Sequence, residues 1–511
     1  MRNETTTYVQ LFLNKKLFVA AFGFFFFFNA TGQNETTNWY FGDNAGVSFV
    51  NGLPVATMAG KLRSGEGCAS ISDKFGNLLF YTDGLFVWNK KHQLMPNGEG
   101  LHGHSSSTQS AYIVPKPANP SIYYIFTLDC EAGNNGVCYS VVNMNLDHGN
   151  GDITDKNVLI RNKCTERIAV YKHDNKNDIW VVIHDFNSSA FVAFLLSKNG
   201  LSANPVITNV GLRHEISKYN NMGYMKFSLD GKRLAVAVNG MDCIQLFDFD
   251  SKTGILSNPV TIQCLKNSKP YGVEFSPNGN ILYIGLVNGG KIYQANLRLK
   301  DGAAISKSMC LIGQTKTGQS IGALQLAIDQ KIYVSENLSN YLAAIEQPDS
   351  LGLLCNYNSK EVFLKGKMCT LGLPIFYLTT NRHQNFPSFF DSNTIVQLNK
   401  KYILSNVLFD TDKALLDPES QSTLTALLAY LKTHGKVKIE IIGHTDAVGS
   451  AAHNNKLSLH RAIEVRNYLV KNSIEFARIT VTGKGFYEPI DENDSDAGRH
   501  RNRRIEFFLK N

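Results

Sequence analysis

Short apolar segments alternate with polar turns through the middle of the chain, from about residue 38 to residue 377. Six copies of one pattern occur there, each with a short strand, a turn rich in Gly, Asn, Asp or Pro, and a second apolar strand. The copies pair residues 68–71 with 78–81, 111–114 with 122–126, 168–171 with 179–183, 224–227 with 234–238, 273–275 with 281–286, and 324–327 with 332–334. The second strands begin 44, 57, 55, 47 and 51 residues apart, close to the period of propeller blades. A further hairpin in each copy gives four strands per unit, so the pattern predicts an all-β propeller.

The number of blades depends on how the ring closes. Strand-like pieces at residues 39–41 and 47–50 could pair with residues 371–376 to complete a seventh blade. Strands from both ends of the region would then leave no free sheet edge. We therefore expect six or seven four-stranded blades, with seven favoured.

The pattern changes after residue 400, where strands alternate with helices. Four leucines recur at helical spacing, namely Leu424, Leu427, Leu428 and Leu431, and Asp417 is a candidate cap for their helix. A second helix carries Ala462, Val465 and Leu469, and residues 437–442, 478–482 and 503–509 are predicted as strands. This alternation predicts a small α/β sandwich. We expect a propeller over residues 33–380, a polar linker over residues 381–400 and the α/β domain over residues 401–511.

One acid and one base in the α/β domain are candidate ligand-binding residues. Thr445 and Asp446 follow the strand that ends at Gly443, and Arg461 lies on the next helix. A carboxylate and a guanidinium on separate elements can hold a ligand that carries both an ammonium and a carboxylate, because Arg binds a carboxylate bidentately. The alternative is an internal ion pair that orients the helix.

Several motifs over residues 402–509 occur together and in a fixed order. They are residues 407–412, His444-Thr445-Asp446, residues 454–462, Gly483-Lys484-Gly485 and residues 498–504. This set resembles the OmpA-like domain of outer-membrane protein A and the peptidoglycan-associated lipoproteins. The resemblance implies that Asp446 and Arg461 bind the zwitterionic end of diaminopimelate in peptidoglycan. It also implies that four further residues line the site: Asp410, Thr445, Asn454 and Arg503. His460 departs from the family, which more often has a charged residue there.

The propeller region resembles propeller domains of secreted proteins from the Bacteroidetes phylum. The resemblance rests on residues 65–73, 80–84, 105–110 and 372–374. Propellers host hydrolases, lyases and binding platforms, so the resemblance implies a fold and not a function.

The N-terminus has the features of a secretory signal peptide. Lys15 and Lys16 precede an apolar run at residues 17–28, and Ala30-Thr31-Gly32 offers a small-residue cleavage site. The run is shorter than the roughly 20 residues that span a membrane. No cysteine precedes Cys68, and no later apolar run is long enough for a transmembrane helix. We therefore predict a signal peptide at residues 1–32 and a non-lipidated mature chain in the periplasm, associated with the cell wall or outer membrane.

Charge and cysteine content refine this prediction. The net charge of the chain is +8, but the α/β domain is nearly balanced, which favours a specific site over a nucleic-acid surface. The arginines at 499, 501, 503 and 504 form a basic cluster, yet two of them fall in a predicted strand. Nine cysteines lie between Cys68 and Cys369, and the candidate disulfide pairs are Cys130 with Cys138 and Cys243 with Cys264. Buried free thiols are the alternative.

The propeller region contains few residues whose type and spacing indicate catalysis. His102 and His104 stand beside three serines without a third nearby ligand. Other candidates for the channel mouth are also typical turn formers: Asp83, His173 with Asp174, His184 with Asp185, and Asp242. We expect no catalytic residue, metal or cofactor. The predicted function is peptidoglycan binding, with the propeller contacting an unknown envelope protein or glycan and with no nucleic-acid partner. The alternatives are a secreted propeller hydrolase of lactonase-like or glycan-cleaving type, and an accessory component of a secretion or gliding machine.

Overall fold

The structure is a computed structural model that describes residues 34–50, 53–214, 219–316, 319–377, 401–404, 420–490, 493, 499 and 502–510. The predicted signal peptide at residues 1–32 and the predicted linker at residues 381–400 lie outside the described residues. The domain boundaries drawn through these segments therefore stay predictions.

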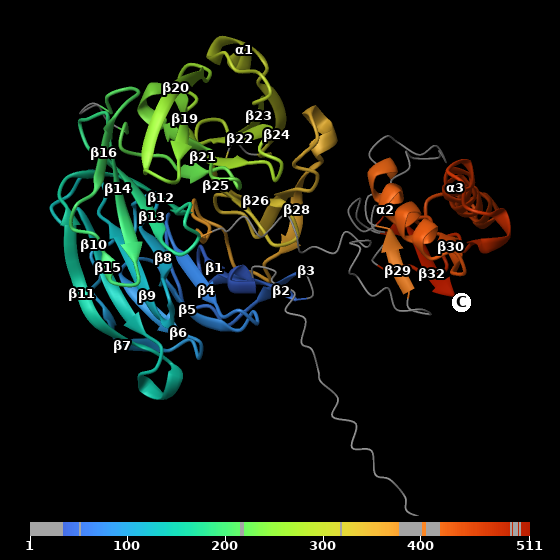
Figure 1. The fold of residues 1–511 in the computed structure, drawn as a ribbon, viewed down its shortest axis with the longest axis horizontal. Helices are drawn as coiled ribbons and strands as arrows, with labels where there is room; N and C mark the ends of the chain where they lie inside the picture. The colour runs from blue at the N-terminus through green and yellow to red at the C-terminus, as the bar shows by residue number, and fades with distance from the viewer. Residues whose placement is uncertain are drawn as a thin grey trace, which may run out of the picture.

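The described part of residues 34–377 forms seven antiparallel sheets arranged as a ring (Figure 1). The first sheet, at the N-terminal end, is described below. The second sheet contains β4 (Ala69–Ser72), β5 (Leu78–Thr82), β6 (Phe86–Asn89) and β7 (Leu94–Glu99). The third contains β8 (Ala111–Lys116), β9 (Asn119–Leu128), β10 (Val137–Asn143) and β11 (Asp152–Arg161). The next two are β12 (Cys164–Lys172), β13 (Ile179–Asp185), β14 (Ala190–Ser197), β15 (Gly200–Leu201) and β16 (Val206–Asn209), then β17 (Met225–Phe227), β18 (Arg233–Val238), β19 (Cys243–Asp250) and β20 (Ile255–Gln263). The last two are β21 (Pro270–Phe275), β22 (Ile281–Leu286), β23 (Lys291–Asn296) and β24 (Cys310–Gln314), then β25 (Ile321–Leu326), β26 (Ile332–Glu336), β27 (Tyr341–Ile345) and β28 (Tyr357–Phe363). The short helix α1 (Gly302–Lys307) connects β23 to β24.

The strands are apolar on both faces because each blade packs between two others. Along β13, Val181 and Ile183 join one hydrophobic cluster, whereas Trp180 and Val182 join another. Successive side chains of a strand point to opposite faces, so alternate residues fill different spaces between blades. The predicted propeller is confirmed.

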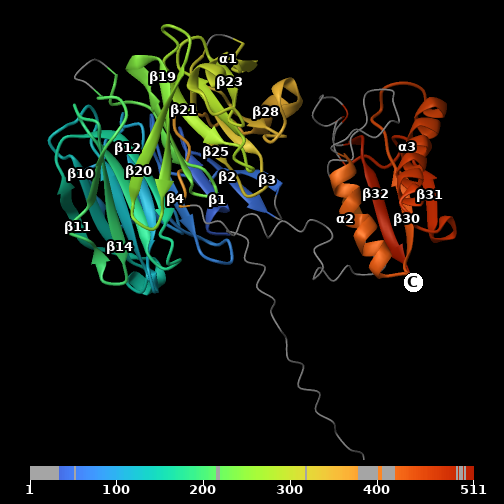
Figure 2. The ribbon, with the colours of Figure 1, turned by 45° about the horizontal axis from the view of Figure 1, so that its top comes forward.

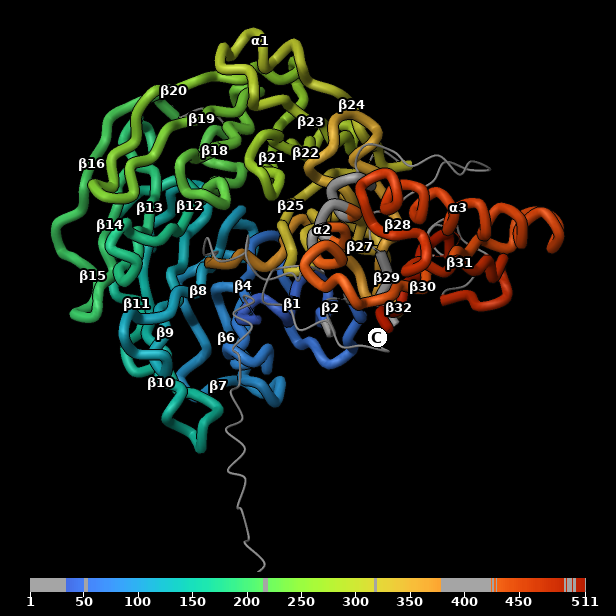
Figure 3. The backbone as a smooth tube through the Cα atoms, turned by 45° about the vertical axis from the view of Figure 1, so that its right-hand side comes forward, coloured from blue at the N-terminus to red at the C-terminus, as the bar shows by residue number. Residues whose placement is uncertain are grey.

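The first sheet closes the ring with help from the end of the region. It consists of β1 (Asn38–Phe41) and β2 (Ala45–Val50), both labelled in Figure 3, and of β3 (Leu53–Thr57). Strand β3 contacts β28 of the last sheet (Figure 1). Met368 bridges to Asp43 beside β1. Residues 371–376 then turn toward the inner strands of the two neighbouring blades, where the Leu371 amide donates to Gly65 (3.0 Å) and the Leu371 carbonyl accepts from Ala323 (2.7 Å). The ring thus has seven sheets, as favoured, but the predicted pairing of residues 371–376 with residues 39–41 and 47–50 is wrong. Among the described residues, the closing sheet has only the three strands β1, β2 and β3, and residues 371–376 bond the two neighbouring blades instead.

The described residues of the C-terminal domain form a four-stranded sheet with two α-helices. The elements are β29 (Lys401–Leu404), α2 (Ser420–Thr433), β30 (Lys438–Gly443), α3 (Ala451–Lys471), β31 (Ile479–Gly483) and β32 (Ile505–Lys510). Figure 2 shows α2 and α3 beside this sheet. The strand order is β29-β32-β30-β31, with β31 parallel and β32 antiparallel to β30. Leu427 of α2, Val465 of α3 and Phe507 of β32 share one hydrophobic core. The α/β prediction is confirmed, but the last strand begins at Ile505, so Arg503 and Arg504 precede it.

All nine cysteines lie in the described part of the chain, and each is a free thiol. The suggested disulfides Cys130–Cys138 and Cys243–Cys264 are therefore wrong for this structure. Cys243 pairs in register with Gln263, so the side chain of Cys264 falls on the opposite face of its sheet. The two thiols accordingly belong to different hydrophobic clusters. Among the described helices, none has the length and apolar character needed to cross a bilayer.

Candidate functional site

The loop after β30 carries Thr445 and Asp446, and neighbouring segments hold it from two sides. The His444 amide donates to the carbonyl of Arg504, and the Thr445 amide donates to the carbonyl of Gly485, both at 2.9 Å. Beneath the loop, Glu506 of β32 contacts Arg504 (2.7 Å) and His444 (3.3 Å), and all three side chains are buried. The position of the loop is therefore fixed by the pairing of β30 with β32.

Helix α3 presents two different faces. Ser450 caps its N-terminus, and the Ser450 hydroxyl accepts a hydrogen bond from the amide of His453. Ala462, Val465 and Leu469 form the apolar stripe that packs in the core. Asn454, Ser458 and Arg461 are also buried, but they form a polar stripe at i, i+4 and i+7. This second face turns toward the Asp446 loop.

A pocket of about 440 Å³ lies between the loop and the helix, and we call it the Asp446 pocket. Its lining residues are Thr445, Asp446, Val448, Gly449, His453, Asn454, Leu457, Arg461, Arg499 and Arg503. Five of the six predicted site residues meet there. The sixth, Asp410, lies outside the described residues.

The ionic contacts of the pocket differ from the simplest expectation. Asp446 forms an ion pair with Arg503 at 2.6 Å, and its other carboxylate oxygen accepts from the Val448 amide at 3.1 Å. Arg461 is only 1% exposed and donates to the carbonyl of His444 at 3.5 Å. Arg461 thus forms the floor of the pocket, whereas Arg503 is the more exposed guanidinium beside the acid. Asn454 donates to the carbonyl of Val448 and fixes the turn between them.

Sequence reasoning missed several lining residues, above all Arg499 and His453. Arg499 donates to the carbonyl of Asn493, whose side chain in turn accepts from the amide of Ala447 (3.0 Å). Arg499 is therefore connected to the Asp446 loop through one residue. His453 precedes Asn454 on α3 and shares its face with Leu457. His453 lies about two helical turns before Arg461, and this spacing could have identified it as a residue on the same face of the helix.

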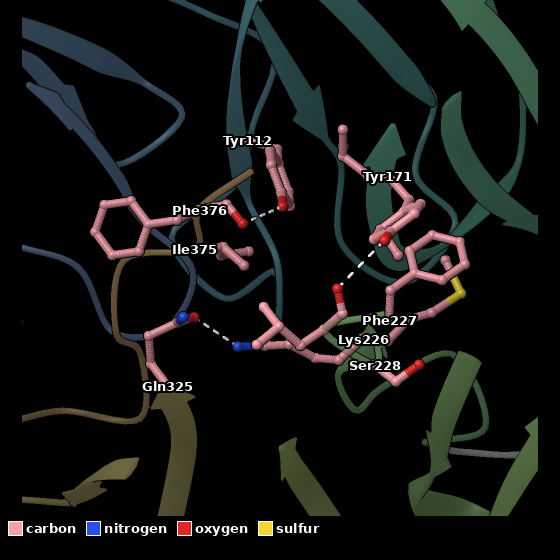
Figure 4. Close-up of a pocket in the computed structure, with 12 residues that line it drawn as sticks. Tyr112, Tyr171, Lys226, Phe227, Ser228, Gln325, Ile375 and Phe376 are labelled. Carbon is pink, nitrogen blue, oxygen red and sulfur yellow. Dashed lines mark hydrogen bonds between the residues drawn. The ribbon is translucent and has the colours of Figure 1, made fainter. Parts of the chain in front are cut away.

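The propeller channel is a second place where polar groups gather (Figure 4). Lys226 of β17 donates to Glu274 (2.9 Å), to the carbonyl of Leu324 (3.0 Å) and to Gln325 (2.6 Å). Beside it, Tyr112 donates to the carbonyl of Phe376. The remaining space is about 30 Å³, the volume of roughly one water molecule. Near Lys226 the channel is therefore filled by groups that satisfy one another.

At the other ends of the inner strands, the Glu66 carboxyl group accepts hydrogen bonds from two different blades. Tyr271 of β21 donates to Glu66 at 2.5 Å, and Ser106 donates to the other oxygen of Glu66 at 3.3 Å. The pKa of Glu66 is raised to about 7, chiefly by burial. The hydrogen bond from Tyr271 lowers this pKa, and the charge of the nearby Glu166 raises it. Glu166 is fully buried, and burial raises its pKa as well.

The other propeller candidates serve local structure. Asp83 accepts from the amides of Leu85 and Phe86, and Asp242 accepts from those of Asn267 and Lys269. His173 and Asp185 are likewise engaged, with the amide of Asn175 and with Arg161 respectively. His184 is buried and stacks on His214, with 3.9 Å between ring centroids. His102 lies 3.8 Å from the thiol of Cys138, and the amide of Ser106 donates to His104. No group of three His, Cys, Asp or Glu side chains suited to a metal occurs in the described part of the chain.

Two family models match separate parts of the chain. The model described as "OmpA family" matches residues 408–503. The C-terminal domain is an OmpA-family domain. The model described as "Lactonase, 7-bladed beta-propeller" matches residues 102–355, so a propeller of that type precedes it.

Curated relatives match the OmpA-family domain. Outer membrane porin F of Pseudomonas fluorescens is 39% identical over 101 residues, which are 20% of this chain and 31% of the porin. Outer membrane protein A of Bordetella avium is 39% identical over 105 residues, which are 20% of this chain and 54% of that protein. Outer-membrane lipoprotein YfiB of Pseudomonas aeruginosa is 37% identical over 105 residues, which are 20% of this chain and 62% of that protein. The chain thus spans about a third to three fifths of the length of these relatives.

Proposed function

We propose that this protein is a non-catalytic component of the bacterial cell envelope that binds peptidoglycan through the Asp446 pocket. The ligand group is the zwitterionic end of the diaminopimelate side chain, and the location is the periplasm, at the wall or the outer membrane. The propeller then presents a surface to an envelope protein or glycan. The OmpA-family domain and its outer-membrane relatives support the location.

One observation carries the proposal. Thr445 and Asp446 from the β30 loop, Asn454 and Arg461 from α3, and Arg503 from the segment before β32 line one pocket. These residues are as far apart as 58 positions in the sequence, yet the fold brings their polar groups together. A pocket with a carboxylate and several guanidinium groups suits a ligand that carries one ammonium and one carboxylate.

In this proposal each charge has its own role. Asp446 takes the ammonium of the ligand, and Arg461 and Arg503 take its carboxylate, with Asn454 holding the turn that positions Asp446. These interactions are ionic and hydrogen-bonded, so the ligand is held without any bond being broken.

Binding of the full-length protein to purified, insoluble peptidoglycan tests the proposal. Asp446→Asn removes the acid, and Arg461→Lys keeps the charge but loses the bidentate geometry. We expect each substitution to weaken binding about tenfold to a hundredfold. Glu464→Gln and Arg466→Lys make the same chemical changes on α3 outside the pocket and serve as matched controls. Parental binding by both pocket variants would refute the assignment.

A second candidate function, lactone hydrolysis by the propeller, is favoured by the match of residues 102–355 to the lactonase model. An activity assay distinguishes lactone hydrolysis from binding without catalysis. The full-length protein is incubated with a panel of lactones, and the acid released is measured at constant pH. The binding proposal expects no turnover above the uncatalysed rate. Turnover that survives Asp446→Asn would assign an activity to the propeller.

A further inference from the structure

A second hollow lies on the other side of α3 from the Asp446 pocket. It has a volume of about 570 Å³, and we call it the Tyr487 groove. Its lining residues are Asn455, Lys456, Leu459, Gly483, Lys484, Tyr487 and Glu488. Along α3, Asn454 and Leu457 face the pocket, whereas Asn455, Lys456 and Leu459 face the groove. The first turns of the helix therefore form the wall between them.

The floors of the two hollows are joined by hydrogen bonds. The Lys484 amide donates to the carbonyl of Gly443 (3.0 Å), and the Thr445 amide donates to the carbonyl of Gly485 (2.9 Å). The Gly485 amide in turn donates to the hydroxyl of Ser458 on α3, also at 2.9 Å. The loop that carries Asp446 and the loop that lines the groove are thus one connected surface.

The groove combines an exposed ring with hydrogen-bonding groups. Tyr487 is 62% exposed, and Leu459 beside it is partly exposed. Lys456 and Asn455 supply donors on one side, while Lys484 and Glu488 form an ion pair at 2.9 Å on the other. An aromatic face bordered by polar groups fits a sugar ring, which has apolar C–H faces and polar edges.

We propose that the Tyr487 groove binds the amino-sugar backbone of the same peptidoglycan strand whose stem peptide enters the Asp446 pocket. This inference rests on the proposed function. A helix with its side chains is about 10 Å wide. The path over the outer face of such a helix is about half its circumference, about 16 Å. Three extended residues span about 10 Å, and the diaminopimelate side chain at one end and the lactyl group of the sugar at the other lengthen the stem, so the sugar comes to the groove side of α3.

Calorimetric binding of two soluble ligands to the full-length protein tests the groove. The first ligand is the tripeptide L-Ala-D-Glu-diaminopimelate, and the second is the same tripeptide on its disaccharide of N-acetylglucosamine and N-acetylmuramic acid. We expect the disaccharide to increase affinity about tenfold. Tyr487→Ala should remove this gain without changing the affinity for the free tripeptide, and Tyr487→Phe should keep it.

Phe476→Ala is the matched control, because Phe476 is another aromatic residue of this domain, is 61% exposed and lies outside the groove. Equal affinities of the unmodified protein for the two ligands would overturn the inference and leave the proposed function intact. An equal loss for both ligands in Tyr487→Ala would also overturn it. Failure of the tripeptide to bind at all would instead remove the proposed function, and the groove with it.

Discussion

Replacing Glu66 with Gln should make the stability of the propeller less dependent on pH. The pKa of Glu66 is raised from 4.5 to about 7, chiefly by burial, with the charge of Glu166 adding to the effect. Because the folded state favours the protonated carboxyl, Glu66 stabilises the propeller fully below pH 4.5, and this stabilisation is lost as the pH rises through about 7. Each tenfold change in proton affinity corresponds to about 1.4 kcal/mol, so the loss amounts to about 3 kcal/mol. Gln is neutral throughout and can still accept the hydrogen bond from Tyr271.

Urea unfolding of the full-length protein at pH 5, 6, 7 and 8 measures this loss. All three tryptophans, Trp39, Trp88 and Trp180, lie in the propeller, so their fluorescence reports its unfolding and not that of the C-terminal domain. The free energy of unfolding of the parent should fall relative to Glu66→Gln as the pH rises. Glu99→Gln alters an exposed carboxyl of the same region and should follow the parent. A constant difference between the parent and Glu66→Gln across these pH values would refute the reasoning.

Two further predictions concern packing. Lys226→Met leaves Glu274 buried without its cation and should lower the free energy of unfolding of the propeller by about 3–5 kcal/mol. Adding Glu274→Leu should recover most of that loss in the same fluorescence assay, and a double variant as unstable as the single one would contradict this account. Gly443→Ala would place a Cβ 1.9 Å from the Ser458 carbonyl, so the C-terminal calorimetric transition should move to lower temperature. Gly435→Ala meets no atom within 4 Å and should leave that transition nearly unchanged.

The inner strands of the propeller could be predicted because their sequences are apolar on both faces. All six residues of β21 are buried, for example, whereas the outer strand β20 is largely exposed, so its apolar pattern is weaker. The hydrogen bonds that close the ring were harder to predict. Residues 371–376 bond segments of two neighbouring blades, and the positions of these segments depend on the complete ring. The predicted pair Cys243–Cys264 failed for a related reason, because a shift of one residue in register moves a side chain to the opposite face.

The binding pocket was predictable only in part. Asp446 and Arg461 follow from local motifs on a loop and a helix. The ion pair of Asp446 with Arg503 joins residues that are 57 positions apart, and it depends on how β32 lies beside β30. Arg499 lines the same pocket and is linked to the Asp446 loop through Asn493, and no local spacing reveals this placement.

The closure of the ring determines how the propeller would bear mechanical load from a domain held by the cell wall. The described part of the propeller ends at Tyr377, directly after residues 371–376, whose amides and carbonyls bond Gly65, Cys68 and Ala323 across the two neighbouring blades. A pull on the C-terminal domain would therefore load these hydrogen bonds near the axis before it loads the outer strands.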